Sequence, residues 1–176
     1  DYVAAAIADG ARVFKSHIQV GDYDPNDPLL DAVWGVLEDS GVPKVIHCGS
    51  GPAPGTYTGP EPIAALLHRF PRLSLIVAHM GMPEYTDFLD LAQRYPEVRL
   101  DTTMAFTDFV EQDSPFPAGD LPRLAEAGPK ILLGSDFPNI PYGYLHQLES
   151  LERVAPDSAW MRAVCHDNAA ALFGIG

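Results

Sequence analysis

Three histidines and one aspartate lie at or near the ends of short apolar runs: His17, His47, His79 and Asp136. Neutral imidazoles and a carboxylate are the ligands of a catalytic zinc or a similar divalent metal. Such a metal lowers the pKa of a bound water and polarises a carbonyl. Taken singly, a histidine at a strand end is more often a core residue or a hydrogen-bonding group. Several at equivalent places favour one shared site.

Five apolar runs must position these residues. We expect strands over Arg12–Ile18, Lys44–Cys48, Leu73–His79, Val98–Thr103 and Lys130–Ser135. They are rich in Val, Ile and Leu, as expected for strands covered on both faces. We expect helices over Leu29–Ser40, Pro62–Phe70, Glu84–Tyr95, Leu121–Ala127, Leu145–Val154, Trp160–Cys165 and Asn168–Phe173. This alternation predicts a parallel α/β sheet or barrel.

The carboxyl ends of parallel strands open onto one face, where such folds build their active sites. Side chains alternate across a strand, so Val77 should share a face with His79, and Val45 with His47. If the odd-numbered residues point into a barrel, both histidines point inward. Cys48 then points outward toward the helices, as an inert core thiol.

The segments between the runs add weaker signals. Gly49–Pro60 is rich in Gly and Pro but lacks the Lys-Ser/Thr of a phosphate-binding loop, so we expect a substrate-covering loop. Aromatic side chains in later segments would suit a small aromatic or unsaturated carboxylate, or would simply pack: Phe106, Phe116, Phe137 and Tyr142. The histidines in predicted helices are expected to be solvated or capping residues: His68, His146 and His166.

Composition limits the class of protein. With 11 Lys and Arg against 24 Asp and Glu, the formal net charge is −13, which argues against a nucleic-acid partner. No apolar run approaches the ~20 residues that cross a bilayer, and no signal peptide is visible. The two cysteines lack CxxC spacing, which favours a reducing, cytoplasmic location. The chain opens with Asp1 inside a helical pattern over residues 1–9, so we expect a fragment.

Several stretches are similar to those of a known family: Phe14–His17, Val45–Gly49, Val77–Gly81, Leu133–Pro138 and Asn168–Gly174. They resemble the metal-dependent amidohydrolase superfamily, and most closely its amidohydrolase-2 branch. That branch contains decarboxylases related to aminocarboxymuconate-semialdehyde decarboxylase, together with hydrolases and lactonases. The resemblance covers residues 1–176 as a single domain. It implies the C-terminal part of a TIM-type (β/α)8 barrel, about strands four to eight, without the N-terminal strands.

The resemblance also implies roles for individual residues. His47 and Asp136 would ligate a divalent metal, with Zn favoured over Mn. His79 and Asp136 would be catalytic, and Lys15 and His17 would bind a substrate carboxylate. The family's first strand carries a His-x-His pair that supplies two metal ligands, and this chain has no such pair. The chain alone would therefore hold at best half of a metal site.

The expected function is a metal-dependent hydrolase of a small carboxylate, lactone or amide, with activity belonging to the parent protein. One alternative is a non-oxidative decarboxylase of the same family. The other is a non-catalytic barrel fragment that acts as a binding module. A five-strand piece exposes two sheet edges, so we also expect a homo-oligomer or association with the missing N-terminal part.

Overall fold

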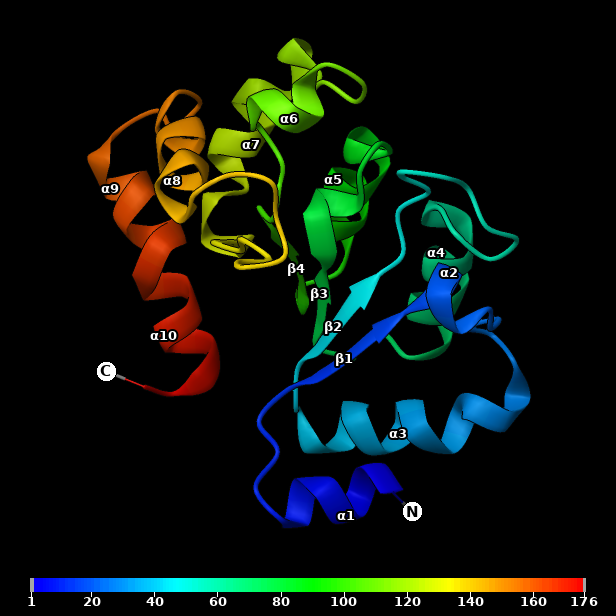
Figure 1. Ribbon diagram of the computed structural model, residues 1–176. Coiled ribbons are helices and arrows are strands. Elements are labelled where there is room, and N and C mark those ends of the chain that lie inside the picture. The colour runs from blue at the N-terminus through cyan, green and yellow to red at the C-terminus, as the bar shows by residue number, and fades with distance from the viewer. Residues whose placement is uncertain (1, 176) are drawn as a thin grey trace.

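The computed structural model describes residues 2–175 and contains one five-stranded parallel sheet, with the strands in chain order (Figure 1). The strands are β1 (Phe14–His17), β2 (Lys44–His47), β3 (Leu75–Val77), β4 (Val98–Asp101) and β5 (Ile131–Leu132). Each of the five predicted runs contains one of these strands, which confirms the parallel α/β architecture. The strands are shorter than predicted; at β3, for example, Ala78 and His79 leave the sheet and begin a turn over Ala78–Gly81.

Helices connect the strands and follow the last one. The α-helices are α1 (Tyr2–Ala8), α2 (Ile18–Gly21), α3 (Asp31–Ser40), α4 (Pro60–Arg69), α5 (Tyr85–Arg94), α6 (Asp108–Glu111), α7 (Leu121–Glu126), α8 (Tyr144–Glu152), α9 (Ser158–Arg162) and α10 (Asn168–Phe173). The single turns are η1 (Pro28–Leu30), η2 (Ala78–Gly81), η3 (Ala118–Asp120), η4 (Gly128–Lys130) and η5 (Ala163–Asp167). All seven predicted helices are present within a few residues, whereas α2 and α6 were not predicted. Asp1, where the helical pattern over residues 1–9 begins, lies outside the described residues.

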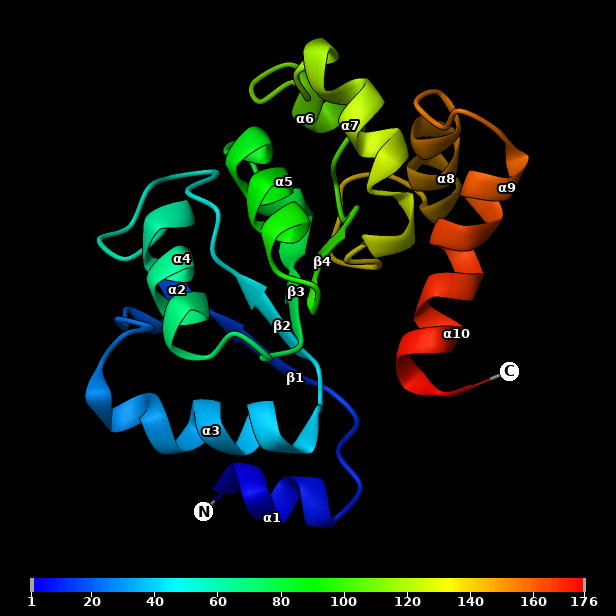
Figure 2. The ribbon, with the colours of Figure 1, turned by 180° about the vertical axis from the view of Figure 1, so that it is seen from behind.

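One face of the sheet carries the hydrophobic core. Helices α4 and α5 lie behind the strands in Figure 1 and in front of them in Figure 2. A row of residues in register across four strands faces these helices and is fully buried: Ile46, Val77, Leu100 and Ile131. Burial of such a row removes apolar surface from water and holds the strands in register.

The opposite face of the sheet carries the polar strand ends, and here one expectation is wrong. Val45 pairs in register with Ile76, so Val77 lies on the face opposite to Val45 and His47. Simple alternation from Val77 would therefore not bring His79 toward His47. His79 reaches that side by a different route, through the left-handed turn η2.

The sheet ends in two open edges. Within residues 2–175, β1 and β5 each pair with a strand on one side only. No helix in the described part of the chain is both long and apolar enough to cross a membrane.

Candidate active site at the strand ends

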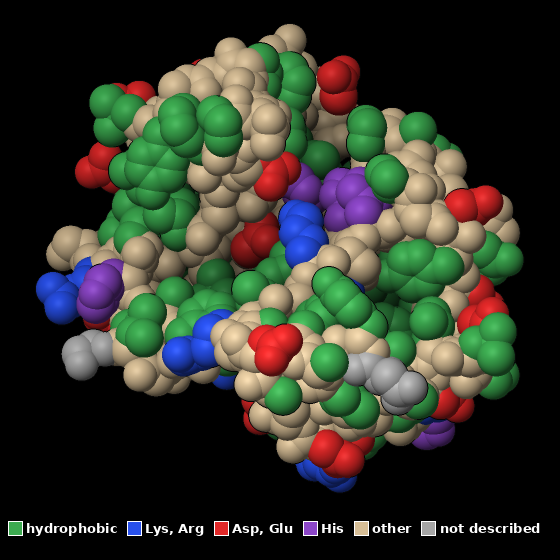
Figure 3. Space-filling model, turned by 60° about the horizontal axis from the view of Figure 1, so that its bottom comes forward, with side chains coloured by type: hydrophobic (Ala, Val, Ile, Leu, Met, Phe, Trp, Pro, Cys, Tyr) green, Lys and Arg blue, Asp and Glu red, His purple; other side chains and the backbone are tan. Residues whose placement is uncertain are grey.

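Three histidines and an aspartate meet at the carboxyl ends of the strands. The His17 and His47 rings are stacked, with centroids 3.7 Å apart, and the His47 and His79 centroids lie 4.7 Å apart. Nε2 of His79 lies 3.8 Å from Oδ2 of Asp136. Figure 3 shows histidine side chains gathered beside a basic side chain in a hollow of the surface. The structure thus brings together residues that are far apart in the sequence.

The turn η2 delivers His79 to this cluster. His79 (φ 56°, ψ 28°) and Met80 (φ 54°, ψ 19°) both have left-handed backbones. This conformation breaks the side-chain alternation of the strand and turns the imidazole toward His47. Gly81 follows with φ +74°, and a Cβ on it would lie 1.9 Å from the Phe88 ring. Only glycine therefore fits the third position of the turn.

The backbone engages one ring nitrogen of His17 and one of His47. The Val20 amide donates to Nδ1 of His17 at 3.3 Å, so neutral His17 carries its proton on Nε2. Nε2 of His47 lies 3.2 Å from the Gly51 carbonyl. Because a carbonyl only accepts, neutral His47 carries its proton on Nε2 and leaves Nδ1 bare. Neutral His17 thus has a hydrogen-bond donor at Nε2, and neutral His47 has a lone pair at Nδ1.

His79 has the opposite tautomer. Its Nδ1 lies 3.2 Å from the Thr103 carbonyl, so Nδ1 carries the proton and Nε2 is bare. The bare nitrogen faces the Asp136 carboxylate, and two acceptors facing each other repel unless a proton or a cation lies between them. His79 is 5% exposed, which makes that repulsion stronger than it would be in water.

Burial keeps two of the imidazoles neutral. Burial first, and then the charge of the neighbouring His79, lower the pKa of His47 to about 4. Burial is also the main cause of the lowered pKa of His17, followed by the charges of His79 and Lys15. The neutral imidazole is the form that ligates a metal.

Lys15 and Asp136 are the exposed members of the site. Lys15 is an exposed residue two positions before His17 on the same strand face, where its charge disfavours protonation of both His17 and His47. Asp136 has a left-handed backbone (φ 52°), and its side chain is 39% exposed. It lies four residues beyond the end of β5, so a loop positions its carboxylate, not the strand that was expected to do so.

The donor set is suited to a divalent metal but is incomplete. His47 and His79 each present a bare nitrogen and Asp136 presents oxygens, which are ligands that zinc accepts. No group of three or more His, Cys, Asp or Glu side chains within residues 2–175 is arranged to hold a metal ion. A catalytic zinc takes three protein ligands. The described residues alone do not fit a complete metal centre.

The loop after β2 is fastened beside His47. The Gly51 amide donates to the Met82 carbonyl at 3.1 Å, and the Ser50 amide donates to the Glu84 carboxylate at 3.1 Å. A Cβ on Gly49 would lie 2.3 Å from the Met82 carbonyl oxygen, so the two segments touch through their backbones. This loop borders the site, and its proposed covering role stays a prediction.

The aromatic residues divide into core and surface. Phe106 and Phe116 are 3% and 8% exposed and pack on each other with centroids 5.1 Å apart, so they do not line the site as considered. Phe137 is 58% exposed, and the Tyr142 hydroxyl donates to the Gln147 side chain. Cys48 is fully buried, which confirms its place in the core, and burial strongly raises the pKa of its thiol.

Sequence reasoning missed the residues that hold the site from behind. Gln147 is fully buried and holds the segment after β4 by three hydrogen bonds. Its Nε2 donates to the Thr102 and Ala105 carbonyls, and its Oε1 accepts from the Met104 amide. Asp101 lies in the expected strand Val98–Thr103 and was given no role, but its Oδ1 accepts from the amide of His79. These contacts span 22 to 45 residues of chain, and no local pattern reports them.

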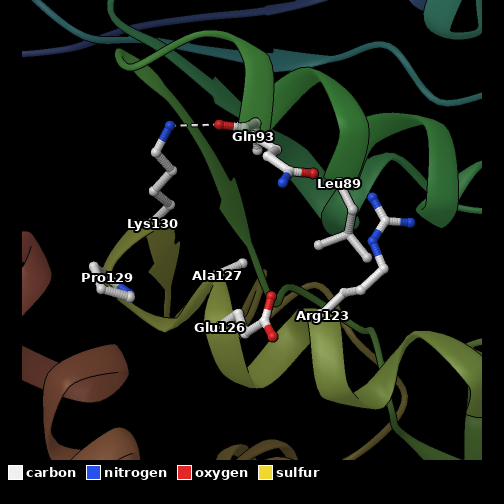
Figure 4. Close-up of a pocket in the computed structure, with 8 residues that line it drawn as sticks. Leu89, Gln93, Arg123, Glu126, Ala127, Pro129 and Lys130 are labelled. Carbon is white, nitrogen blue, oxygen red and sulfur yellow. Dashed lines mark hydrogen bonds between the residues drawn. The ribbon is translucent and has the colours of Figure 1, made fainter.

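A separate cavity of about 460 Å³ lies between α5 and α7 (Figure 4). Its lining includes Arg123 and Lys130, but both cations already have partners. Arg123 pairs with Asp90 and Asp120, and Lys130 donates to backbone carbonyls of α5 and the residue after it. None of the strand-end histidines lines this cavity, so it is separate from the candidate active site.

Comparison with known proteins identifies the family. A family model described as amidohydrolase matches residues 1–175. The chain belongs to the amidohydrolase family. A comparison of the chain with curated proteins gave no match.

Solved structures share the fold of this chain at low sequence identity. An uncharacterised TIM-barrel protein from Bordetella bronchiseptica has 24% identity and a TM-score of 0.79, and the alignment covers 97% of this chain and 60% of that chain. A dihydroorotase from Campylobacter jejuni has 17% identity and a TM-score of 0.70, with coverage of 98% and 61%. The 5-carboxyvanillate decarboxylase from Sphingomonas paucimobilis has 18% identity and a TM-score of 0.61, with coverage of 93% and 58%.

The amidohydrolase chain thus spans about 60% of the length of these structures. The five parallel strands and their helices are those of a partial TIM-type barrel, which confirms the predicted fold class.

Proposed function

We propose that the parent protein of this chain is a divalent-metal-dependent hydrolase that opens a lactone or amide bond in a small substrate bearing a carboxylate. The observation that carries the proposal is the His79–Asp136 pair. Nδ1 of His79 donates its proton to the Thr103 carbonyl, and the bare Nε2 lies 3.8 Å from a carboxylate oxygen of Asp136. Such a pair can take up a proton and stabilise the charge that results.

In this proposal, Nε2 of His79 accepts a proton from an attacking water, and Asp136 stabilises the imidazolium. The same Nε2 returns the proton to the leaving oxygen or nitrogen. Lys15 and the Nε2–H of His17 bind the substrate carboxylate, because both are donors on one face of β1 and the Lys15 charge acts on His17 and His47. A bound metal would polarise the scissile carbonyl. His47 and Asp136 would ligate that metal, and the remaining ligands would come from outside this chain.

A non-oxidative decarboxylase is the second candidate, and one of the similar folds belongs to such an enzyme. In that reaction the bond between a substrate carbon and its carboxylate breaks, CO₂ leaves, and the carbon takes a proton. The Nε2 of protonated His79 could supply this proton. The same residues therefore serve either chemistry, and the substrate pose decides between them.

The test is a substrate panel for the full-length protein: lactones, cyclic amides and aromatic or unsaturated carboxylates. A hydrolase yields a product heavier by one water, whereas a decarboxylase releases CO₂. His79→Asn should reduce turnover by about 10²–10⁴-fold, as is usual for loss of a general base. His68→Asn, on the exposed face of α4, is the matched control and should leave turnover unchanged. A fully active His79→Asn variant would refute the mechanism. If the wild-type protein turned over no substrate of the panel, a non-catalytic binding module would be favoured.

A further inference from the structure

His79 lies in the site only because its backbone adopts a conformation that its sequence disfavours. A left-handed backbone is strained for a residue with a Cβ, and here His79 and Met80 adopt it in succession. In an extended continuation of β3, His79 would follow Val77 to the helix-facing side of the sheet. Other contacts must therefore hold the left-handed turn in place.

Those contacts converge on Asp101, the last residue of the neighbouring strand β4. Its Oδ1 accepts from the His79 amide at 3.1 Å and from the Thr103 amide at 3.0 Å. The Thr103 carbonyl in turn accepts from Nδ1 of His79 at 3.2 Å. One carboxylate oxygen thus fixes the backbone of His79 and also the segment that selects its tautomer.

We propose that Asp101 is a positioning residue of the active site, which holds His79 in its left-handed turn and, through Thr103, keeps its Nε2 bare and directed at Asp136. This inference rests on the proposed function for its catalytic consequence, but not for its structural content. Asp101 is 9% exposed, and hydrogen bonds from amides to a buried carboxylate are among the stronger ones in proteins.

Packing around the carboxylate supports this role. A Cβ on Gly134 would lie 2.1 Å from Oγ1 of Thr103 and 2.9 Å from Oδ1 of Asp101. The loop from β5 to Asp136 therefore rests directly on the two residues that hold His79. This contact places His79 and Asp136 against the same support, so a shift of Asp101 would change both ends of the pair.

The test compares three substitutions in the full-length protein. Asp101→Asn keeps an oxygen that accepts from both amides, Asp101→Glu keeps the charge but cannot occupy the same position, and Asp101→Ala removes the acceptor. Nitrogen-15 NMR of the histidine side chains reports the tautomer of His79. We expect the Nδ1–H tautomer in the wild type and in Asp101→Asn, and its loss in Asp101→Glu and Asp101→Ala.

Asp120→Ala is the matched control, since Asp120 is also 9% exposed and accepts from Thr86 and Arg123 away from the site. It should destabilise the fold without changing the His79 signal. If Asp101→Ala fails to fold, the comparison of the other two variants still tests the inference: the Nδ1–H tautomer of His79 should be kept in Asp101→Asn and lost in Asp101→Glu. An unchanged tautomer in Asp101→Glu, or its loss in Asp101→Asn, would overturn the inference.

Kinetics separate this inference from the proposed function. With a substrate in hand, Asp101→Glu should lower kcat about 10–100-fold, because small misplacements of a catalytic group have effects of this size, and KM should change little. If no substrate is turned over but the NMR order holds, the proposed function fails and the positioning role stands.

Discussion

Lys44 and Lys130 are two lysines with lowered pKa values and different surroundings. Lys44 is 6% exposed with its ammonium 5.9 Å from the centre of the Trp34 ring, and burial alone lowers its pKa to about 8. The ammonium of Lys130 is half-buried but donates to two backbone carbonyls. Burial of the Lys44 ammonium therefore opposes folding, whereas Lys130 stabilises α5 by donating to carbonyls at its C-terminal end.

Lys44→Met should stabilise the protein at pH 7 by about 1–2 kcal/mol. One unit of pKa corresponds to ~1.4 kcal/mol, and the loss of a cation–π contact offsets part of the gain. In the wild type, the unfolded chain binds more protons between pH 8 and 10.5, so the free energy of unfolding rises with pH across this window. Urea unfolding at several pH values should show that this rise is absent in the variant.

Lys130→Met is the comparison for this prediction. It should lose about 1 kcal/mol, because the carbonyls at the end of α5 lose their donor. A less stable Lys44→Met protein, or one that keeps the rise in stability above pH 8, would contradict our reading of Lys44.

At the scale of elements, the turn η2 shows where sequence reasoning succeeds and where it stops. Apolar periodicity predicts the strands and the main helices, because each buries one face against the core. It does not predict that β3 ends two residues before His79, or that the chain then turns left-handed. That turn depends on Asp101 and on the Phe88 ring, which the sequence places 22 and 9 residues away from His79.

The same limit applies to the site itself. The histidines could be identified because a polar residue at the end of an apolar run is unusual, and the sequence shows this pattern at both His47 and His79. The supporting contacts of Gln147 could not be predicted from the sequence, because a glutamine in a helix gives no signal that it is buried. Asp136 lies 3.8 Å from His79, and its role stays a prediction; the loop that carries it has no regular pattern from which its path could be predicted.

Gly81→Ala tests the turn as an element. The new methyl group would overlap the Phe88 ring at a backbone with φ +74°, so we expect a loss of about 2–4 kcal/mol in urea unfolding. Gly35→Ala is the matched control inside α3, where a Cβ meets nothing within 4 Å. It should gain about 0.5–1 kcal/mol, because alanine favours helix over glycine. Equal stability of the two variants would show that η2 is not a constrained turn.

At the scale of the whole molecule, the chain has the form of a barrel that has not closed. The two sheet edges, β1 and β5, lack a second neighbour within the described residues, and large apolar side chains such as Leu145 are well exposed. The similar structures are longer by about two fifths of their length. We propose that further strands close the barrel and bring the missing metal ligands to His47 and Asp136.

The most direct test of the central claim is the metal content of the full-length protein, measured by elemental analysis for the wild type, His47→Ala and the control His68→Ala. The account predicts near-stoichiometric zinc or manganese in the wild type and in His68→Ala, and loss of the metal in His47→Ala with the fold retained by circular dichroism. Well-folded wild-type protein without metal, or His47→Ala protein that keeps its metal, would contradict the account.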